Sequence, residues 1–239
     1  MHIFYCAHII DNKAQLSPEE SKHCIRVLRL GKGEKVQLID GRGGWYNAVI
    51  TIPDVKQCGL DIINAINHNR TRSFTLHLAI APTKNIDRFE WFVEKVVEIG
   101  IDVITPLICQ RSERRTLKTD RLQKLIISTM KQAMVPYLPT LHELVEFDRF
   151  ISSFQGSSYN HFIAHCEDNE KKKLLEEAAP HTNVVVMIGP EGDFTPGEID
   201  LAVAQGFIPV TLGPNRLRTE TAGIVACHTL NLLNELPKR

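Results

Sequence analysis

Short apolar runs of strand length occupy the first part of the chain. They are HIFYC (2–6), EKVQLID (34–40), WYNAVIT (45–51) and GLDIINAI (59–66). Several short strands within about seventy residues predict a small β-barrel. The segment Asp40-Gly41-Arg42-Gly43-Gly44 between two of the runs predicts a hairpin loop. The segment Ser17-Pro18-Glu19-Glu20 predicts one helical turn with a capping box.

From Phe74 onward the apolar runs alternate with helical patterns. The runs span 74–81, 103–108, 162–165, 184–188 and 208–212. A helix is predicted after a capping box at Asp87–Glu90, ending at Gly100, and another over 120–134. Alternation of strands and helices predicts an α/β domain, in which helices cover both faces of a parallel sheet. We therefore expect a β-barrel domain over 1–70, a polar linker at 67–73 and an α/β domain over 74–239.

Composition and charge set limits on the class of protein. The chain has 239 residues, of which 43% are hydrophobic and 23% charged, with a formal net charge of zero. No apolar run reaches the length of a membrane span, and the first residues lack the charged-then-apolar pattern of a secretory leader, so none is expected. The six cysteines are far apart in sequence, so reduced thiols in a cytoplasmic protein are expected. The ten histidines show no spacing typical of metal ligands.

Two loops near the carboxyl terminus carry more functional groups than a turn requires. IGPEGDFTPGEI (188–199) leaves one predicted strand, and LGPNRLRTETAG (212–223) leaves the next. Thr195, Pro196 and Glu198 predict a capping box in the first, and Thr219 or Thr221 is expected to cap a helix in the second. Ligands of open parallel sheets bind beyond the carboxyl ends of strands, and glycine lets backbone approach them. A ligand pocket is favoured over two plain turns.

Several other kinds of site lack their signatures. Neither loop reads Gly-x-Gly-x-x-Gly or a Walker motif, and no Gly-x-Ser-x-Gly elbow is present. His161 and His165 lie four residues apart on a predicted strand, which favours buried, hydrogen-bonded histidines over a metal site.

The paired loops resemble the cofactor-binding loops of the SPOUT methyltransferases. Within them the chain most closely resembles the RsmE family, ribosomal RNA small-subunit uridine N3-methyltransferases. HCIRVLRL (23–30), RFEWFVEKVVEIGI (88–101), ITPL (104–107) and Gln132 match the family's segments in the same order. The resemblance covers nearly the whole chain. Asp193 stands where the family more often has glycine, and Ala133-Met134-Val135 where an arginine is common.

The resemblance implies a PUA-like β-barrel, a SPOUT domain with a C-terminal trefoil knot, and a homodimer. It implies S-adenosyl-L-methionine as cofactor and 16S ribosomal RNA, or the small ribosomal subunit, as substrate, with no membrane or metal. The residues expected to bind the cofactor are His165, Ile188, Gly189, Pro190, Glu191, Gly192, Leu212, Gly213, Asn215, Leu217, Arg218 and Thr221.

Methyl transfer to uridine N3 requires that the N3 proton leave, and a fixed cation stabilises the resulting charge. We expect Arg218 to supply that cation, and Glu220 to orient Arg218 or to cap a helix rather than to act as the base. No covalent cysteine nucleophile is needed, because N3 attacks directly.

The residues expected to contact RNA are Arg26, Arg29, Lys84, Arg111, Arg114, Arg115 and Gln132. A solvated charged face is the alternative for the basic run at 111–124. Two alternatives for function are open. One is another SPOUT RNA methyltransferase, acting on a different base or on a ribose 2'-oxygen. The other is a non-enzymatic RNA-binding assembly factor.

Overall fold

The computed structural model describes residues 1–67, 72–154, 156–167 and 171–235. Its contacts divide the chain into two units, the first comprising Met1–Thr71 with Ile127–Leu138 and the second Arg72–Ile126 with Pro139–Arg239. The linker expected at 67–73 falls mainly on 68–71, which lie outside the described residues.

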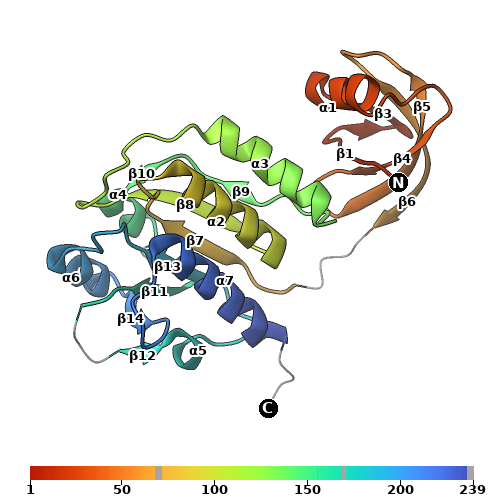
Figure 1. Cartoon of the computed structure of the whole chain (residues 1–239). Coiled ribbons are helices and arrows are strands. Elements are labelled where there is room, and N and C mark those ends of the chain that lie inside the picture. Colours follow the sequence, from red (N-terminus) through yellow and green to blue (C-terminus); the bar gives the residue numbers. More distant parts are fainter. Residues whose placement is uncertain (68–71, 155, 168–170, 236–239) are drawn as a thin grey trace. The chain divides into compact units, whose positions relative to one another are not determined.

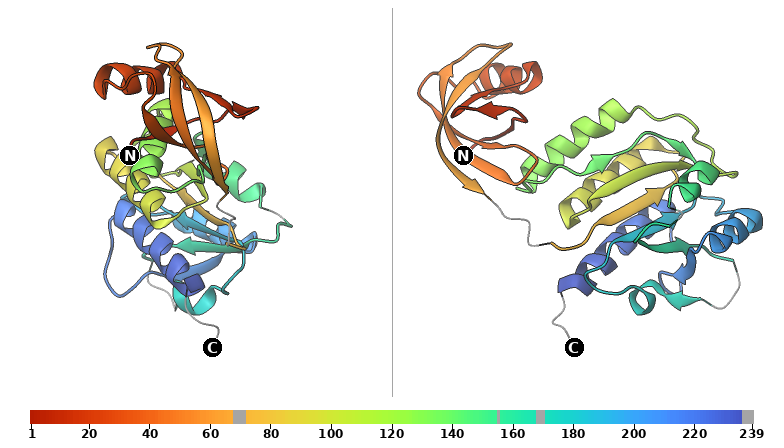
Figure 2. Two further views of the ribbon diagram at one scale, coloured as in Figure 1. Left: turned by 90° about the vertical axis from the view of Figure 1, so that its right-hand side faces the viewer. Right: turned by 180° about the vertical axis from the view of Figure 1, so that it is seen from behind.

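The first unit is built on a six-stranded sheet in the order β1-β4-β5-β6-β3-β2. Its strands are β1 (Ile3–Tyr5), β2 (Ile9–Ile10), β3 (Lys13–Gln15), β4 (Lys35–Ile39), β5 (Gly44–Ile52) and β6 (Gly59–Asn67). Only the β1–β4 pair is parallel. The sheet curls into a half-barrel (Figure 2), with β1 and β2 at its two edges, so the barrel is open among the described residues. Phe4, Leu38 and Ile50 are among the side chains of its core.

A short helical segment lies between β3 and β4 in the first unit. It consists of α1 (Pro18–Lys22) followed by a π-helical turn, η1 (His23–Val27). Ser17 caps α1 as predicted, because its hydroxyl accepts the amide of Glu20 at 3.2 Å. The predicted capping box is wrong, however, because the Glu20 carboxylate accepts the amide of Tyr5 and pairs with Lys131 at 2.5 Å. Glu20 thus connects α1 to β1 and to the segment 127–138.

The segment 127–138 belongs to the first unit through backbone contacts as well. The amide of Gly43 donates to the carbonyl of Pro136 at 3.0 Å, and the amide of Leu138 donates to the carbonyl of Gly41 at 2.9 Å. Both bonds engage the hairpin loop between β4 and β5. The predicted hairpin is confirmed, and its Asp40 carboxylate accepts the amides of Arg42 and Gly44.

The second unit contains an eight-stranded, entirely parallel sheet. Its order is β10-β8-β7-β13-β11-β14-β12, with β9 also pairing with β8. The strands are β7 (Leu76–Ile80), β8 (Val103–Ile108), β9 (Thr140–Leu141), β10 (Val145–Glu146), β11 (Asn160–Ala164), β12 (Lys172–Lys173), β13 (Val184–Ile188) and β14 (Ile208–Thr211). Every residue of the central strands β7 and β13 is buried, as expected for strands covered on both faces.

Helices form a layer on each face of this sheet. They are α2 (Ile86–Ile99), α4 (Phe147–Ser152), α5 (Leu174–Glu177), α6 (Pro196–Ala204) and α7 (Thr219–Glu235). Helix α3 (Thr119–Gln132) begins in the second unit and ends in the first. Helices α2 and α7 run side by side (Figure 1), and α7 packs on β7 and β13. Side chains of α4 and α6, such as Phe150 and Ile199, pack with Ala79 and Met187 in a second core cluster. The α/β architecture predicted from the alternating pattern is confirmed.

The helix caps agree only partly with the sequence predictions. The capping box of Thr195 and Glu198 is present at the start of α6. The box predicted at Asp87 is wrong, because α2 begins two residues earlier than that box requires and Asn85 caps it by accepting the amide of Asp87 at 3.0 Å. Thr219 does not cap α7 but is its first residue, and its hydroxyl donates to the carbonyl of Gly189 at 3.1 Å. Thr221 lies inside the helix.

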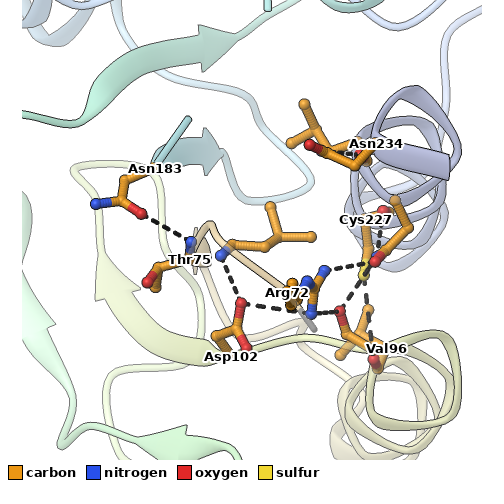
Figure 3. A network of polar contacts seen from close by, with 11 residues as sticks. Arg72, Thr75, Val96, Asp102, Asn183, Cys227 and Asn234 are labelled. Atoms are coloured by element: carbon orange, nitrogen blue, oxygen red, sulfur yellow. Dashed lines mark hydrogen bonds and ion pairs between the residues drawn. The ribbon is translucent and has the colours of Figure 1, made fainter. Parts of the chain in front are cut away.

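Arg72 anchors the carboxyl-terminal part of α7 (Figure 3). Its guanidinium donates to the carbonyl of Gly100 at 2.8 Å and to the Asn231 side chain at 2.5 Å. It also pairs with Asp102 at 3.4 Å and stacks over the ring of Phe74 at 4.2 Å. A partly buried cation with this many partners fixes α7 against α2 and the start of β7.

Candidate active site

The loops that follow β13 and β14 meet around one cavity in the second unit. The cavity has a volume of about 390 Å³, within the range of about 300–1,000 Å³ typical of small-molecule sites. It lies at the carboxyl ends of β11 and β13, where ligands of parallel sheets bind. Its lining residues are Arg88, Ala164, Cys166, Ile188, Gly189, Pro190, Glu191, Asp193, Arg216, Leu217, Arg218, Thr219, Glu220 and Ala222.

The loop after β13 is held by segments that are distant in sequence. The Glu191 carboxylate accepts the amide of Lys84 at 2.8 Å. The Arg111 guanidinium donates to the carbonyl of Gly192 at 2.8 Å. On its inner side, the carbonyl of Gly189 accepts the hydroxyl of Thr219. Contacts with three separate segments fix the backbone of this loop before any ligand arrives, which favours tight and specific binding.

Asp193 has a larger part in this loop than the sequence indicates. Its backbone adopts φ of 62°, a left-handed conformation that glycine adopts most easily. Asp is one of the few other residues that tolerate it, because its short carboxylate bonds locally. The carboxylate accepts the amide of Cys166 at 2.7 Å and that of Phe194 at 2.8 Å. Asp193 therefore joins the end of β11 to the loop in a backbone conformation that glycine also adopts easily.

The loop after β14 reaches the cavity with its second half. Gly213 adopts φ of 144°, a conformation that residues with side chains rarely adopt, and its backbone bonds the hydroxyl of Thr211. This turn directs residues 216–218 toward the cavity, whereas Leu212, Gly213 and Asn215 are not among its lining residues.

The cavity wall contains charges of both signs. Arg88, Arg216 and Arg218 supply cations, and Glu191, Asp193 and Glu220 supply carboxylates. Glu220, in the first turn of α7, has a side chain only 7% exposed, and its ion-pair partner is Arg88 at 3.9 Å. The partner expected from the sequence was Arg218, which is exposed and makes no side-chain hydrogen bond or ion pair with the described residues.

His165 and Cys166 follow β11 and differ in their surroundings. His165 is 6% exposed, its Nδ1 lies 3.4 Å from the Lys171 Nζ, and its Nε2 has no hydrogen-bond partner among the described residues. Burial, with the nearby Lys171 charge, lowers the pKa of His165. The expectation of buried, hydrogen-bonded histidines holds in part: His165 is buried but its Nε2 has no partner among the described residues, and His161 bonds Ser157 at 2.7 Å but is only half-buried.

The Cys166 thiol is an unsuitable nucleophile. Cys166 lines the cavity, but burial and the charge of Asp193 raise the pKa of its thiol. A raised pKa keeps the thiol protonated near neutral pH, and the thiolate is the reactive form. In the described part of the chain, no group of three or more His, Cys, Asp or Glu side chains is arranged to hold a metal ion.

The arginines at 111–115 bind backbone carbonyls of neighbouring loops. Arg111 also donates to the carbonyl of Phe194, Arg114 donates to those of Thr83 and Lys84, and Arg115 reaches those of Cys109 and Gln110. These contacts give Arg111 and Arg114 a role in holding the loops beside the cavity. Lys84 pairs with Glu113 at 2.8 Å. In the first unit, Arg26, Arg29 and Gln132 are exposed.

The predicted and observed lining overlap in part. Of the predicted site residues, Ile188, Gly189, Pro190, Glu191, Leu217, Arg218 and Glu220 line the cavity. His165, Gly192, Leu212, Gly213, Asn215 and Thr221 do not. Sequence reasoning missed Arg88, Ala164, Cys166, Asp193, Arg216, Thr219 and Ala222. A signal for Arg88 was available, because it lies in the first turn of a helix that follows a strand end.

Two family models match the chain. A model described as an RNA methyltransferase domain matches residues 70–231, and one described as an RNA methyltransferase PUA domain matches residues 16–63. The chain belongs to this RNA methyltransferase family. The resemblance noted from the paired loops is therefore confirmed, and the curled sheet of the first unit is the family's PUA domain.

Individual RNA methyltransferases match over nearly the whole chain. The ribosomal RNA small subunit methyltransferase E of Synechocystis sp. is 28% identical, covering 95% of this chain and 75% of the relative. The crystal structure of a probable rRNA-methyltransferase from Porphyromonas gingivalis is 35% identical, with a TM-score of 0.88 over 98% of both chains. The ribosomal RNA small subunit methyltransferase E of Neisseria gonorrhoeae, solved bound to S-adenosyl methionine, is 27% identical, with a TM-score of 0.87 over 98% of both chains.

Proposed function

We propose that this chain is an S-adenosyl-L-methionine-dependent methyltransferase that modifies a uridine of 16S small-subunit ribosomal RNA at N3. The observation that carries the proposal is the single cavity formed by both glycine-bearing loops. Further support comes from relatives named ribosomal RNA small subunit methyltransferase E, and from the similar Neisseria structure that holds S-adenosyl methionine. The specificity for N3 rests on the resemblance to the RsmE family.

The residues around the cavity fit this methyl donor. Ile188, Leu217, Ala164 and Ala222 supply apolar lining of the kind that an adenine ring requires. Gly189 brings backbone to the wall, and a side chain there would come within 3.1 Å of Phe194. The charged groups of the lining suit the polar end of the donor.

When bound, S-adenosyl-L-methionine supplies an electrophilic methyl group. The protein's contribution is to position the uridine and to stabilise the charge that develops on its ring as the N3 proton leaves. Arg218 is suited to this role, because it lines the cavity and its guanidinium is uncommitted to the described residues. Cys166 takes no part as a nucleophile, because its thiol stays protonated.

The proposal for RNA contact is coarser. Arg26 and Arg29 on the PUA domain, and Lys84 with the arginines at 111–115 on the other unit, are proposed to contact phosphates. The carbonyl contacts of Arg111 and Arg114 limit how many of their donors are available for phosphate. The trefoil knot, the homodimer and a cytoplasmic location stay predictions. Among the described residues, no helix has both the length and the apolar character of a membrane span.

Two measurements test the proposal. Titration calorimetry with S-adenosyl-L-methionine should show binding to the full chain, and no heat would favour the non-enzymatic RNA-binding protein. Mass spectrometry of ribosomal nucleosides from a strain lacking the gene should show loss of 3-methyluridine. Loss of a different modified nucleoside would favour another SPOUT methyltransferase.

Arg218→Ala tests the catalytic assignment. We expect cofactor affinity to stay within a few-fold while methyl transfer to ribosomal RNA falls by about a hundredfold or more, the effect of removing one charge-stabilising donor. Arg149→Ala, which changes an exposed arginine of α4, is the matched control and should retain full activity. Substantial methyl transfer by Arg218→Ala would remove Arg218 from the mechanism.

A further inference from the structure

Arg88 and Glu220 form a loose ion pair on the cavity wall. The Arg88 Nη1 lies 3.9 Å from the Glu220 Oε1, beyond the 2.7–3.2 Å of an N–H···O hydrogen bond. Within the described part of the chain, neither side chain makes a hydrogen bond. Arg88 is 45% exposed, whereas Glu220 is only 7% exposed. The Glu220 side chain is mostly buried, its one cation partner is too distant to hydrogen-bond, and its carboxylate faces the cavity, where a ligand can reach it.

Two other charged side chains with little exposure, Glu20 and Arg72, are more completely bonded. Glu20 has both Lys131 at 2.5 Å and the amide of Tyr5. Arg72 has a carbonyl, an amide side chain and a carboxylate around it. Glu220, on the cavity wall, lacks the hydrogen bonds that Glu20 and Arg72 make.

The two other carboxylates on the cavity wall are already engaged. Glu191 accepts the amide of Lys84, and Asp193 accepts the amides of Cys166 and Phe194. Glu220 is thus the lining carboxylate whose oxygens make no hydrogen bond with the described residues. Arg88 provides a cation directly beside it, so the pair presents both charges at one place.

We infer that Arg88 and Glu220 recognise the zwitterionic amino-acid end of the methyl donor. An α-amino acid carries a carboxylate and an ammonium group on one carbon, and a neighbouring cation and anion complement both. Arg88 would bind the carboxylate through the paired donors of its guanidinium, and Glu220 would accept the ammonium. The apolar lining residues, such as Ile188 and Leu217, are left for the adenosine. This inference rests on the proposed function.

A pair of ligands that differ only at the amino-acid end tests the inference. S-adenosylhomocysteine contains that end, and 5′-methylthioadenosine has the same nucleoside and a thioether but lacks it. Titration calorimetry on the full chain should show that Arg88→Met and Glu220→Gln weaken S-adenosylhomocysteine binding about tenfold to a hundredfold, as expected for hydrogen bonds between charged groups. The affinity for 5′-methylthioadenosine should stay within about twofold. Lys95→Met, on the same helix, is the control and should change neither affinity.

The outcomes separate the inference from the proposed function. If both variants bind both ligands as the wild type does, or lose affinity for both equally, the selective role is refuted. If the wild-type protein binds neither ligand, the proposed function itself is refuted. Arg88→Lys keeps the charge but not the planar pair of donors. Its affinity for S-adenosylhomocysteine should fall between those of wild type and Arg88→Met, and its affinity for 5′-methylthioadenosine should match the wild type. An unfolding curve for each variant shows whether the fold is retained.

Discussion

Gly223 lies where helix α7 packs against α2 and β7. An alanine at this position tests whether this packing determines the position of the cavity wall. A Cβ on Gly223 would lie 2.5 Å from a ring carbon of Phe92 and 2.9 Å from the Ile80 side chain. Ordinary contact begins near 3.4 Å, so the Phe92 ring would have to move by about 0.9 Å. Phe92 and Ile80 are fully buried, so neither side chain has space to move into.

The net effect of Gly223→Ala is the difference of two terms. Alanine favours a helix over glycine by about 1 kcal/mol. Overpacking a core costs typically about 1–3 kcal/mol, and the 2.5 Å contact with a ring that cannot retreat places this site near the upper end. We expect the free energy of unfolding to fall by about 2 kcal/mol. Affinity for S-adenosyl-L-methionine should also fall. Thr219 lines the cavity one helical turn before Gly223, so a shift of α7 at Gly223 also moves the cavity wall.

Gly197→Ala in α6 provides the matched control for this substitution. It makes the same chemical change in a helix, but a Cβ at Gly197 meets nothing within 4 Å. Its stability should rise slightly, by up to about 1 kcal/mol. Urea denaturation of both variants gives the comparison. Adding Phe92→Leu to Gly223→Ala should recover part of the lost affinity. Equal stability of the two alanine variants would refute the reasoning.

Two further predictions concern the cavity loop and the core. Asp193→Ala should be less stable than Asp193→Gly by about 1 kcal/mol in urea denaturation, because both lose the amide contacts but only alanine is strained at φ of 62°; equal stabilities would contradict this. Burial, aided by the charge of His142, lowers the pKa of His77 from 6.5 to about 3. In the unfolded chain, His77 binds a proton below about pH 6.5, whereas in the folded chain it binds one only near pH 3. The free energy of unfolding therefore falls as pH falls through this range. Between pH 6.0 and 4.5, the free energy of unfolding of His77→Gln should fall by about 2 kcal/mol less than that of the wild type. If the free energies of unfolding of the two proteins change with pH in parallel, His77 is not responsible.

Local sequence patterns determined the elements of this protein and the two loops that matter most. The alternation of apolar runs with helical spacing predicts the parallel sheet, because burial on both faces demands such runs. Ser17 and Thr195 are recognisable caps, because a cap is a contact between residues three apart. The glycine-bearing loops after β13 and β14 are visible as segments with more charge and rigidity than a turn requires.

Only the tertiary structure decided which side chains complete the cavity. Arg88 on α2 meets Glu220 on α7, and Asp193 meets the amide of Cys166, across long separations in sequence. These contacts follow from the order β7-β13-β11-β14, in which spatial neighbours are not consecutive strands. The basic run at 111–115 shows the same limit, because its arginines bind carbonyls of loops that only folding brings near. Periodicity records whether a residue is buried, whereas its partner depends on how distant elements pack.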